Sequence, residues 1–312
     1  MSDLVAELAS GERRPLARFL TRIEAGDPAL RSVLPELFKA GRGGHVIGIT
    51  GPPGSGKSTL VNALTAEWRR RGRRVGILAV DPSSPYTGGA VMGDRIRMME
   101  HAADRDVFMR SMASRGELGG LAGTTWLAVA ALDAAGFDPI VIETVGAGQS
   151  EVEIARLAES TVVVEVPDMG DEVQAIKAGL LEVADVIAVN KGDRPGADRA
   201  ARQLRAMLST AGGRIRRHPP PVLLTTATTA DGVAKLADAI DADRSRAREP
   251  SQARDRARHQ IRRALADLAL ARAEALAPEW EAALDAVAER TQDPITAAAS
   301  LMGGTDEPSE PD

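Results

Sequence analysis

The feature that most constrains this chain is a glycine-rich segment just after residue 50. It reads Gly51-Pro52-Pro53-Gly54-Ser55-Gly56-Lys57-Ser58-Thr59. It fits the pattern G-x-x-x-x-G-K-[ST], in which backbone N–H groups wrap phosphate groups. The apolar run His45–Thr50 before it predicts a strand, and the apolar spacing in Ser58–Arg71 predicts a helix. A strand, a glycine-rich loop and a helix in this order predict a phosphate-binding loop inside an α/β fold.

Two side chains of this loop have predicted roles in nucleotide chemistry. Lys57 is expected to reach the β- and γ-phosphates, and the Ser58 hydroxyl to ligate Mg²⁺. We expect the whole segment 51–59 to contact the nucleotide, because the helix that follows adds the positive end of its dipole.

Short apolar runs alternate with helical patterns between residues 45 and 240. Five further runs predict strands: Val75–Val80, Pro139–Ile142, Thr161–Val166, Val186–Val189 and Val222–Leu224. Continuous apolar runs separated by helices are typical of parallel strands buried on both faces. The sequence therefore predicts a doubly wound, mainly parallel sheet, with ligands at the carboxyl ends of its strands.

Helical patterns flank this region at both ends. We predict an N-terminal helical extension over residues 1–40 and the nucleotide-binding domain over 41–245. A C-terminal helical extension follows over 246–302, in which Asp293-Pro294 predicts a capped helix start. The tail 303–312 is acidic and contains proline, which predicts disorder.

The second informative motif follows the predicted strand Val186–Val189. It reads Asn190-Lys191-Gly192-Asp193 and fits N-K-x-D, which reads guanine in phosphate-loop GTPases. The Asp193 carboxylate can accept hydrogen bonds from guanine N1–H and its 2-amino group, which adenine does not offer in that arrangement. Thr226 and Ala227, at the end of the next strand, are expected to supply backbone N–H groups to the base. GTP and GDP are therefore the predicted ligands.

Three carboxylates are candidates for the magnesium and catalytic machinery beside Lys57. Asp81 and Glu143 stand at the carboxyl ends of predicted strands, each directly after the apolar run, and Asp94 lies in the glycine-containing segment between them. Carboxylates at strand ends beside a phosphate loop can support Mg²⁺ directly or through water. We assign Ser58, Asp94 and Glu143 to the metal, with contact through water expected for Glu143. A water-positioning glutamine is not obvious, since Gln149 stands three residues after Gly146; slow intrinsic hydrolysis is therefore predicted.

Taken together, the motifs resemble one known family. They are GPPGSGKST, VDPSSPYTGGAVMGDRIRM, SRGELGGL, ETVGAGQSE, PDMGDEVQAIKAG and NKGD. This set resembles the MeaB/MMAA group of GTPase chaperones, some of which were formerly labelled arginine/ornithine transport kinases. The resemblance covers roughly residues 10–295.

The resemblance implies a function and partners. It implies that GTP hydrolysis gates adenosylcobalamin loading into an acyl-CoA mutase, chiefly methylmalonyl-CoA mutase, and protects or reactivates that enzyme. It also implies roles for Asp81, Asp94 and Glu143 near magnesium, a further switch segment Val166–Lys177, and a homodimer formed by the C-terminal helices.

Four other classes of protein fit the sequence less well. A nickel-insertion GTPase needs soft or imidazole ligands, but the chain has no cysteine and its four histidines are scattered. A small-molecule kinase would need an acceptor site, which is not visible, and a partitioning ATPase would need a lysine where Pro52 and Pro53 stand. A nucleic-acid binder is suggested by the basic stretches Arg199–His218 and Arg244–Arg263, but these stretches lack interleaved aromatic residues for stacking on bases.

Composition and charge bear on location and partners. The net charge of −5 argues against a globally basic nucleic-acid binder. The absence of cysteine suits a reducing compartment. The N-terminus lacks a signal-peptide pattern, and the most apolar window, Leu121–Phe137, contains Asp133 and predicts a buried helix rather than a membrane span. We therefore expect a cytoplasmic protein that binds neither membranes nor nucleic acid.

Overall fold

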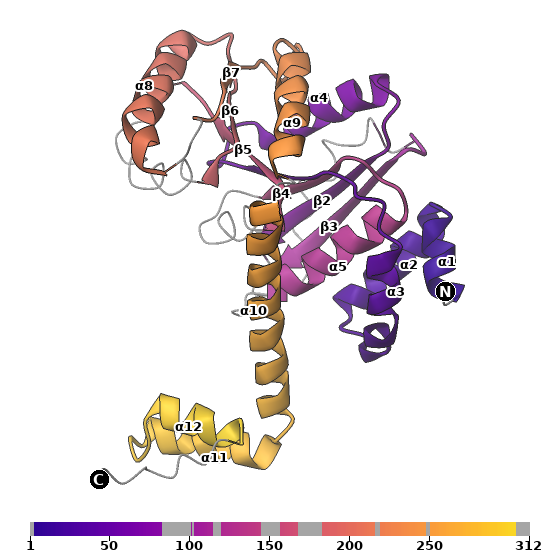
Figure 1. Cartoon of the computed structure of the whole chain (residues 1–312), viewed down its shortest axis with the longest axis vertical. Helices are drawn as coiled ribbons and strands as arrows, with labels where there is room; N and C mark the ends of the chain where they lie inside the picture. The colour runs from indigo at the N-terminus through magenta and orange to yellow at the C-terminus, as the bar shows by residue number, and fades with distance from the viewer. Residues whose placement is uncertain are drawn as a thin grey trace. The chain divides into compact units, whose positions relative to one another are not determined.

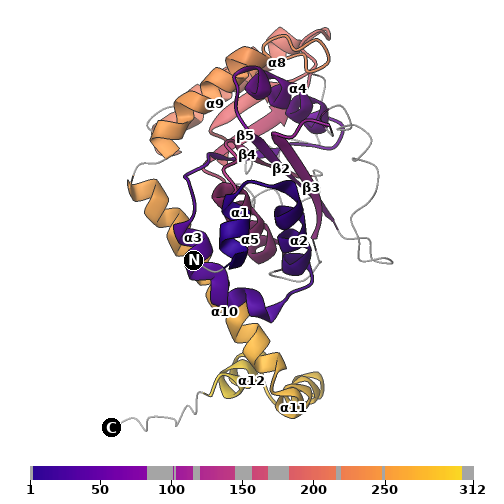
Figure 2. The ribbon, with the colours of Figure 1, turned by 90° about the vertical axis from the view of Figure 1, so that its right-hand side faces the viewer.

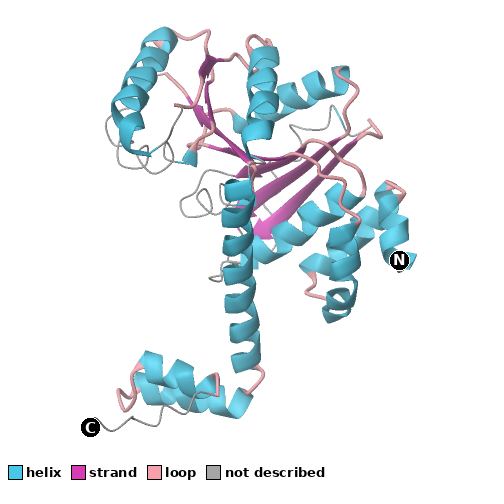
Figure 3. Ribbon diagram, in the orientation of Figure 1, coloured by secondary structure: helices cyan, strands magenta, loops and turns pink. Residues whose placement is uncertain are grey.

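The structure, a computed structural model, falls into two units. It describes residues 3–82, 101, 103–114, 120–144, 157–167, 183–215, 219–247 and 250–303. The first unit is Met1–Arg256 and the second is Ala257–Asp312. Strands and helices alternate in the first unit, whereas the second unit is helical where it is described (Figure 3).

A seven-stranded parallel sheet forms the centre of the first unit. Its strands are β1 (Val46–Thr50), β2 (Val75–Pro82), β3 (Val107–Ser114), β4 (Ile140–Thr144), β5 (Ser160–Glu165), β6 (Val186–Val189) and β7 (Val222–Leu224). The order across the sheet is β3-β2-β4-β1-β5-β6-β7, and every neighbouring pair is parallel. From β1 the chain builds β2 to β4 on one side and β5 to β7 on the other. The carboxyl end of β1 is therefore the switch point where such sheets bind ligands.

The predicted parallel α/β fold is confirmed, but the predicted strand set was incomplete. The strand β3 was missed because Arg110 and Ser111 interrupt its apolar pattern. It is an edge strand, in which these two residues are only half-buried. An edge strand does not need the continuous apolar run that marks the strands between two neighbours.

Helices occupy both faces of the sheet and both ends of the chain. The first unit contains α1 (Asp3–Ala9), α2 (Arg13–Glu24), the 3₁₀ helix η1 (Pro28–Val33), α3 (Leu34–Lys39), α4 (Lys57–Arg70), α5 (Gly120–Ala134), α8 (Ala197–Ile215) and α9 (Val233–Ala247). The helices α10 (Pro250–Glu274), α11 (Ala277–Ala288) and α12 (Pro294–Leu301) follow. Figure 1 shows α4 and α9 on one side of the sheet and α5 on the other.

The α4 face of the sheet is packed by aliphatic side chains and one tryptophan. Leu60, Leu64 and Trp68 recur at helical spacing on α4 and are fully buried. They share a core with Ile49 of β1 and Val141 of β4. This packing fixes the helix that begins directly after the glycine-rich loop, so the loop has a rigid support at each end.

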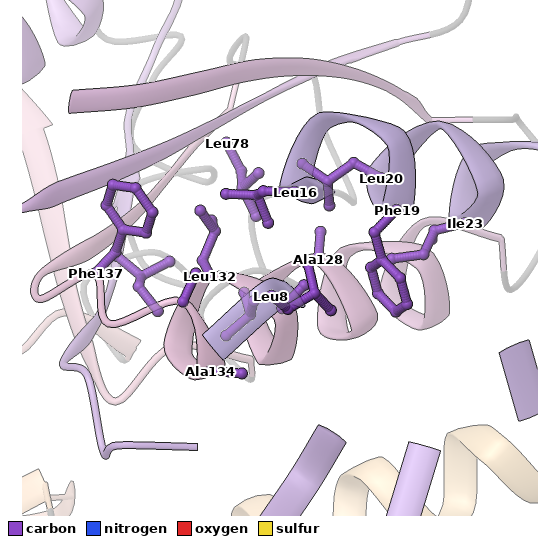
Figure 4. Close-up of a cluster of buried hydrophobic side chains, with 14 of the residues drawn as sticks. Leu8, Leu16, Phe19, Leu20, Ile23, Leu78, Ala128, Leu132, Ala134 and Phe137 are labelled. Atoms are coloured by element: carbon purple, nitrogen blue, oxygen red, sulfur yellow. The ribbon is translucent and has the colours of Figure 1, made fainter. Parts of the chain in front are cut away.

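The opposite face carries α5 and, outside it, the N-terminal helices. Figures 1 and 2 both show α1 and α2 beside α5. Leu16, Phe19 and Leu20 of α2 are fully buried in one cluster with Ala128 and Leu132 of α5 (Figure 4). The apolar face of α2, in the predicted N-terminal helical extension, therefore packs on the sheet domain itself.

A polar network fastens α9 to the amino-terminal edge of the sheet. The Ser160 hydroxyl donates to the Asp243 carboxylate at 2.6 Å and lies 2.8 Å from His45 Nε2. Arg244 donates to Asp138, which also accepts from the His45 backbone N–H at 3.0 Å. Burial lowers the pKa of His45 to about 4, helped by the charge of Arg244. The imidazole is therefore neutral near pH 7.

The described C-terminal helices carry exposed apolar side chains. The α12 N-cap is Asp293, whose carboxylate accepts from the backbone N–H groups of Ile295 and Thr296, as the sequence predicted. Across the residues that the structure describes, no helix combines the length and apolar character needed to cross a membrane.

Candidate functional site

The glycine-rich loop occupies the turn between β1 and α4. Gly51 has φ of 144°, and a Cβ built there would lie 2.2 Å from the carbonyl oxygen of Val164 on β5. Gly56 has φ of 88°, and a Cβ there would lie 2.5 Å from Asn190 Nδ2. Both positions need glycine because L side chains disfavour these angles and the neighbours leave no room. The glycines of the motif therefore seat the loop on β5 and on the N-K-x-D segment.

The Lys57 ammonium lies inside the loop. It donates to the carbonyl oxygens of Gly51 at 2.7 Å and Pro52 at 3.0 Å, and the side chain is buried. Because Lys57 is also the first residue of α4, its charge adds to the positive end of the helix dipole. The arrangement concentrates positive potential where an anion would meet the loop.

Ser58 and Glu143 meet on the α4 face of the sheet. The Ser58 hydroxyl donates to Glu143 Oε1 at 2.5 Å, and Glu143 is only 5% exposed. Together they place a hydroxyl and a carboxylate oxygen side by side at the carboxyl end of β4. Hard oxygen donors of this kind fit Mg²⁺, which takes one or two protein ligands and completes its shell with phosphate and water.

The side chains of the two other predicted carboxylates lie outside what the structure describes. Asp81 is the penultimate residue of β2, where its backbone pairs with Ala113, but its side chain lies outside what is described. Asp94 lies outside the described residues, as do Gln149 and Lys177.

The N-K-x-D segment lies directly against the phosphate loop. Asn190 is buried, and its Nδ2 donates to the Ser55 carbonyl oxygen at 2.9 Å. Its Oδ1 accepts from the Ala227 backbone N–H at 3.2 Å. Lys191 Nζ donates to the Gly54 carbonyl oxygen at 2.8 Å. The structure thus brings three predicted segments together: the phosphate loop, the N-K-x-D turn and the turn after β7.

Asp193 is exposed beside this contact. Gly192 fixes the turn, since its N–H donates to the Thr225 carbonyl oxygen at 2.9 Å. The Thr226 backbone N–H is already paired with the Asp231 carbonyl oxygen at 2.9 Å, and that of Ala227 with Asn190. A base that drew on those two N–H groups would therefore have to replace existing hydrogen bonds.

Three buried polar residues at this edge were not singled out from the sequence. Glu165 ends β5, is 4% exposed, and its backbone oxygen accepts from the Asn190 N–H at 2.7 Å. Thr50 and Thr144 end β1 and β4, and both are buried. The available signal was a polar residue that closes an apolar run, the same signal that identified Glu143. A buried glutamate is thus the last residue of β5 and the penultimate residue of β4, the two strands that neighbour β1.

Comparisons with known proteins agree with this geometry. Residues 16–280 match the family model described as methylmalonyl-CoA mutase-associated GTPase MeaB. A candidate GTPase of Pyrococcus horikoshii is 40% identical over 304 residues, which cover 96% of each chain. The mitochondrial methylmalonic aciduria type A homolog of Mus musculus is 36% identical over 62% of this chain and 48% of its own length.

One solved structure resembles nearly the whole chain. It is the crystal structure of a LAO/AO transport system kinase, with 27% identity and a TM-score of 0.67. The likeness covers 97% of this chain and 96% of that one. It therefore includes the helical segments at both ends as well as the sheet.

Proposed function

Because the chain belongs to the MeaB family of methylmalonyl-CoA mutase-associated GTPases, we propose that its GTP hydrolysis controls an adenosylcobalamin-dependent acyl-CoA mutase. The enzyme is a GTPase by family, and the mutase is the proposed partner, with methylmalonyl-CoA mutase the first choice. The family match that carries this proposal spans residues 16–280, and the mouse relative is named for methylmalonic aciduria. The proposed task is to gate cofactor loading and to protect or reactivate the mutase.

The proposed nucleotide position follows from the contact between the two motifs. Segment 51–59 would hold the phosphates, with Lys57 facing the β- and γ-phosphates. Asp193, with Asn190 and Lys191 behind it, would read guanine, and Thr226 and Ala227 would border the base. The support is that Asn190 and Lys191 both contact carbonyl groups of the phosphate loop, so base and phosphates share one continuous surface.

Magnesium is proposed to bind beside Ser58 and Glu143, with Asp94 as a further contributor and Asp81 in the catalytic machinery close to the ion. The ion would neutralise phosphate charge when bound. The Glu143 carboxylate orients the Ser58 hydroxyl, because it accepts a hydrogen bond from that hydroxyl at 2.5 Å. Burial of the carboxylate strengthens this interaction, because the local dielectric is lower than that of water.

Hydrolysis is proposed to be slow alone and faster with the partner. Partner stimulation is common where a GTPase lacks a residue that positions the attacking water. Hydrolysis can switch a surface between two conformations if it changes their populations. To change the ratio of the two populations from 1:99 to 99:1, the nucleotide must prefer one conformation by about 5.5 kcal/mol. The γ-phosphate contacts that disappear on hydrolysis are the proposed source of this energy.

The C-terminal helices are proposed to pair two copies of the chain. Ile261, Leu265 and Leu268 lie at i, i+4 and i+7 of α10 and are 60%, 61% and 51% exposed. Exposed apolar side chains at this spacing form a stripe typical of a helix that packs on another helix. A second copy presents the same stripe, and a two-fold pair would bury both.

The test is a GTPase assay with a purified mutase. The rate of phosphate release is measured for the chain alone, with an adenosylcobalamin-dependent mutase from the same organism, and with an unrelated CoA enzyme as control. We expect acceleration only with the mutase, and a recovery of inactivated mutase that requires hydrolysable GTP. An unchanged rate together with no recovery would overturn the proposed partner while leaving the GTPase assignment intact.

A further inference from the structure

The last two residues of β4 hold the two flanks of the phosphate loop. Glu143 accepts a hydrogen bond from the hydroxyl of Ser58, which lies at the end of the loop. Thr144, the next residue, donates its hydroxyl to that of Thr50 at 3.4 Å, and Thr50 lies just before the loop. The loop is thus tied at its entry and at its exit to consecutive residues of one neighbouring strand.

The two ties lie on opposite faces of the sheet. Successive side chains of a strand point to opposite faces. Val141 packs in the α4 core, so Glu143, two residues later, lies on the α4 face, where it meets Ser58. Ile142 packs with α5, so Thr144 lies on the α5 face. The register that pairs Ile49 with Glu143 brings Thr50 alongside Thr144 on that second face.

The threonine pair lies where polar groups are costly. Thr50 is 0% exposed and Thr144 is 1% exposed. Removing one hydroxyl leaves the other hydroxyl buried with one hydrogen-bond partner fewer. This destabilises the folded chain by more than the net free energy that the hydrogen bond itself contributes. A threonine can also stand in a strand merely for its β-branched shape. Substitution by valine keeps that shape, so it separates the two explanations.

We propose that Thr144 is a positioning residue for GTP hydrolysis. Through Thr50 it fixes the carboxyl end of β4 against the start of the phosphate loop. This keeps Glu143 in line with Ser58 on the other face, although Thr144 itself touches neither nucleotide nor metal. Its effect should therefore appear in the rate of the chemical step rather than in nucleotide affinity, because the Lys57 and Asn190 contacts stay in place.

The experiment measures kcat and KM for GTP at saturating magnesium in the full chain. The variants are Thr144→Val, Thr50→Val, the double variant and Thr144→Ser. Thr65→Val is the matched control, since Thr65 is a fully buried threonine of α4 whose hydroxyl donates within its own helix, to the Val61 carbonyl oxygen at 2.7 Å. Thermal unfolding is recorded for each variant.

We expect kcat to fall about fivefold in each single valine variant, with KM changed less than twofold. The double variant should be no slower than either single variant, because both remove the same bond. Thr144→Ser should recover most of the rate, and Thr65→Val should keep it.

The proposal is overturned if the kcat of Thr50→Val stays within twofold of the wild-type value, or if the losses multiply in the double variant. It is equally overturned if Thr65→Val lowers kcat as much, since the effect would then follow general stability. If Thr144→Val does not fold, Thr50→Val and Thr144→Ser decide the question alone.

Discussion

At the scale of single residues, Asn190 joins the two halves of the site. Its amide group donates to the phosphate loop through Ser55 and accepts from the turn after β7 through Ala227. A buried amide that uses both its donor and its acceptor fixes its own orientation. The exposed Asp193, three residues later, therefore follows a rigidly held segment of backbone. Selective recognition of a purine requires a carboxylate that is held in a fixed position.

The contact between Ser58 and Glu143 leads to a prediction about magnesium. Replacing Glu143 by Gln removes the carboxylate charge but keeps its size. We expect GTP hydrolysis to fall at least about tenfold and the magnesium concentration for half-maximal rate to rise, because the amide is a weaker partner for both hydroxyl and cation. A magnesium titration of the hydrolysis rate measures both effects. Glu281→Gln, at an exposed position of α11, is the control. An unchanged magnesium dependence in Glu143→Gln would contradict the assignment.

The sequence predicted those site residues whose meaning lies in local spacing. Lys57 and Ser58 are fixed within one loop, and Asn190 within one turn, so a short motif identifies them. The sequence did not identify Thr144 and Glu165 as site residues, because each is only a polar residue at the end of an apolar run. Their positions gain meaning once it is known that β4 and β5 are the neighbours of β1.

At the scale of elements, α9 is fastened by polar groups as well as by its apolar face. The Ser160 hydroxyl links His45 to Asp243, while Asp138 accepts a hydrogen bond from Arg244, one residue further along the helix. These contacts join α9 to the amino-terminal ends of β1, β4 and β5. The strand pattern did not predict this network, because charged residues just outside a strand usually indicate solvent rather than a buried partner.

The low pKa of His45 predicts acid sensitivity. The pKa is about 4 in the folded chain against 6.5 ordinarily, so the unfolded chain binds the proton first as pH falls. Stability is therefore unaffected by this group above about pH 6.5 and declines between about pH 6.5 and 4, by about 3 kcal/mol in total. Burial raises the pKa of Asp138, but hydrogen bonds from the His45 N–H and from Arg244 hold this pKa below its ordinary value. Protonation of Asp138 therefore reduces stability only at lower pH.

Urea unfolding at pH 7 and pH 4.5 measures this effect. His45→Gln removes the titrating group and should show a smaller difference between the two pH values than the wild-type chain. His259→Gln, a histidine of α10, serves as the control and should keep the wild-type difference. An identical pH dependence in the wild-type chain and His45→Gln would show that His45 is not responsible.

At the scale of the whole molecule, the nucleotide-binding unit and the C-terminal helices differ in how they bury apolar surface. The first unit encloses its large aliphatic side chains, whereas Leu265 and its neighbours on α10 are mostly exposed. The sequence predicted helices in both regions from the same kind of stripe. It could not tell which stripe packs within its own chain, because periodicity gives the apolar face of a helix but not its partner.

The proposed pairing of two copies gives a prediction at this scale. Leu265→Glu places a charge in the centre of the exposed stripe, where a paired helix would have to bury it. We expect the wild-type chain to be a dimer and the variant to be a monomer with unchanged thermal stability of the nucleotide unit, as measured by light scattering and calorimetry. Met207→Glu, at an exposed position of α8, is the control. A wild-type monomer, or a variant that stays dimeric, would contradict the pairing.

The central claim is that one continuous surface at the carboxyl edge of the sheet holds a guanine nucleotide, with Asp193 reading the base. The most direct measurement is competition of GTP, ATP and xanthosine triphosphate (XTP) against a fluorescent GDP, for the wild-type chain and for Asp193→Asn. We predict that the wild-type chain prefers GTP over ATP and XTP by at least about a hundredfold, and that Asp193→Asn abolishes the preference for GTP over XTP. Equal binding of ATP and GTP by the wild-type chain, or unchanged selectivity in Asp193→Asn, would contradict the account.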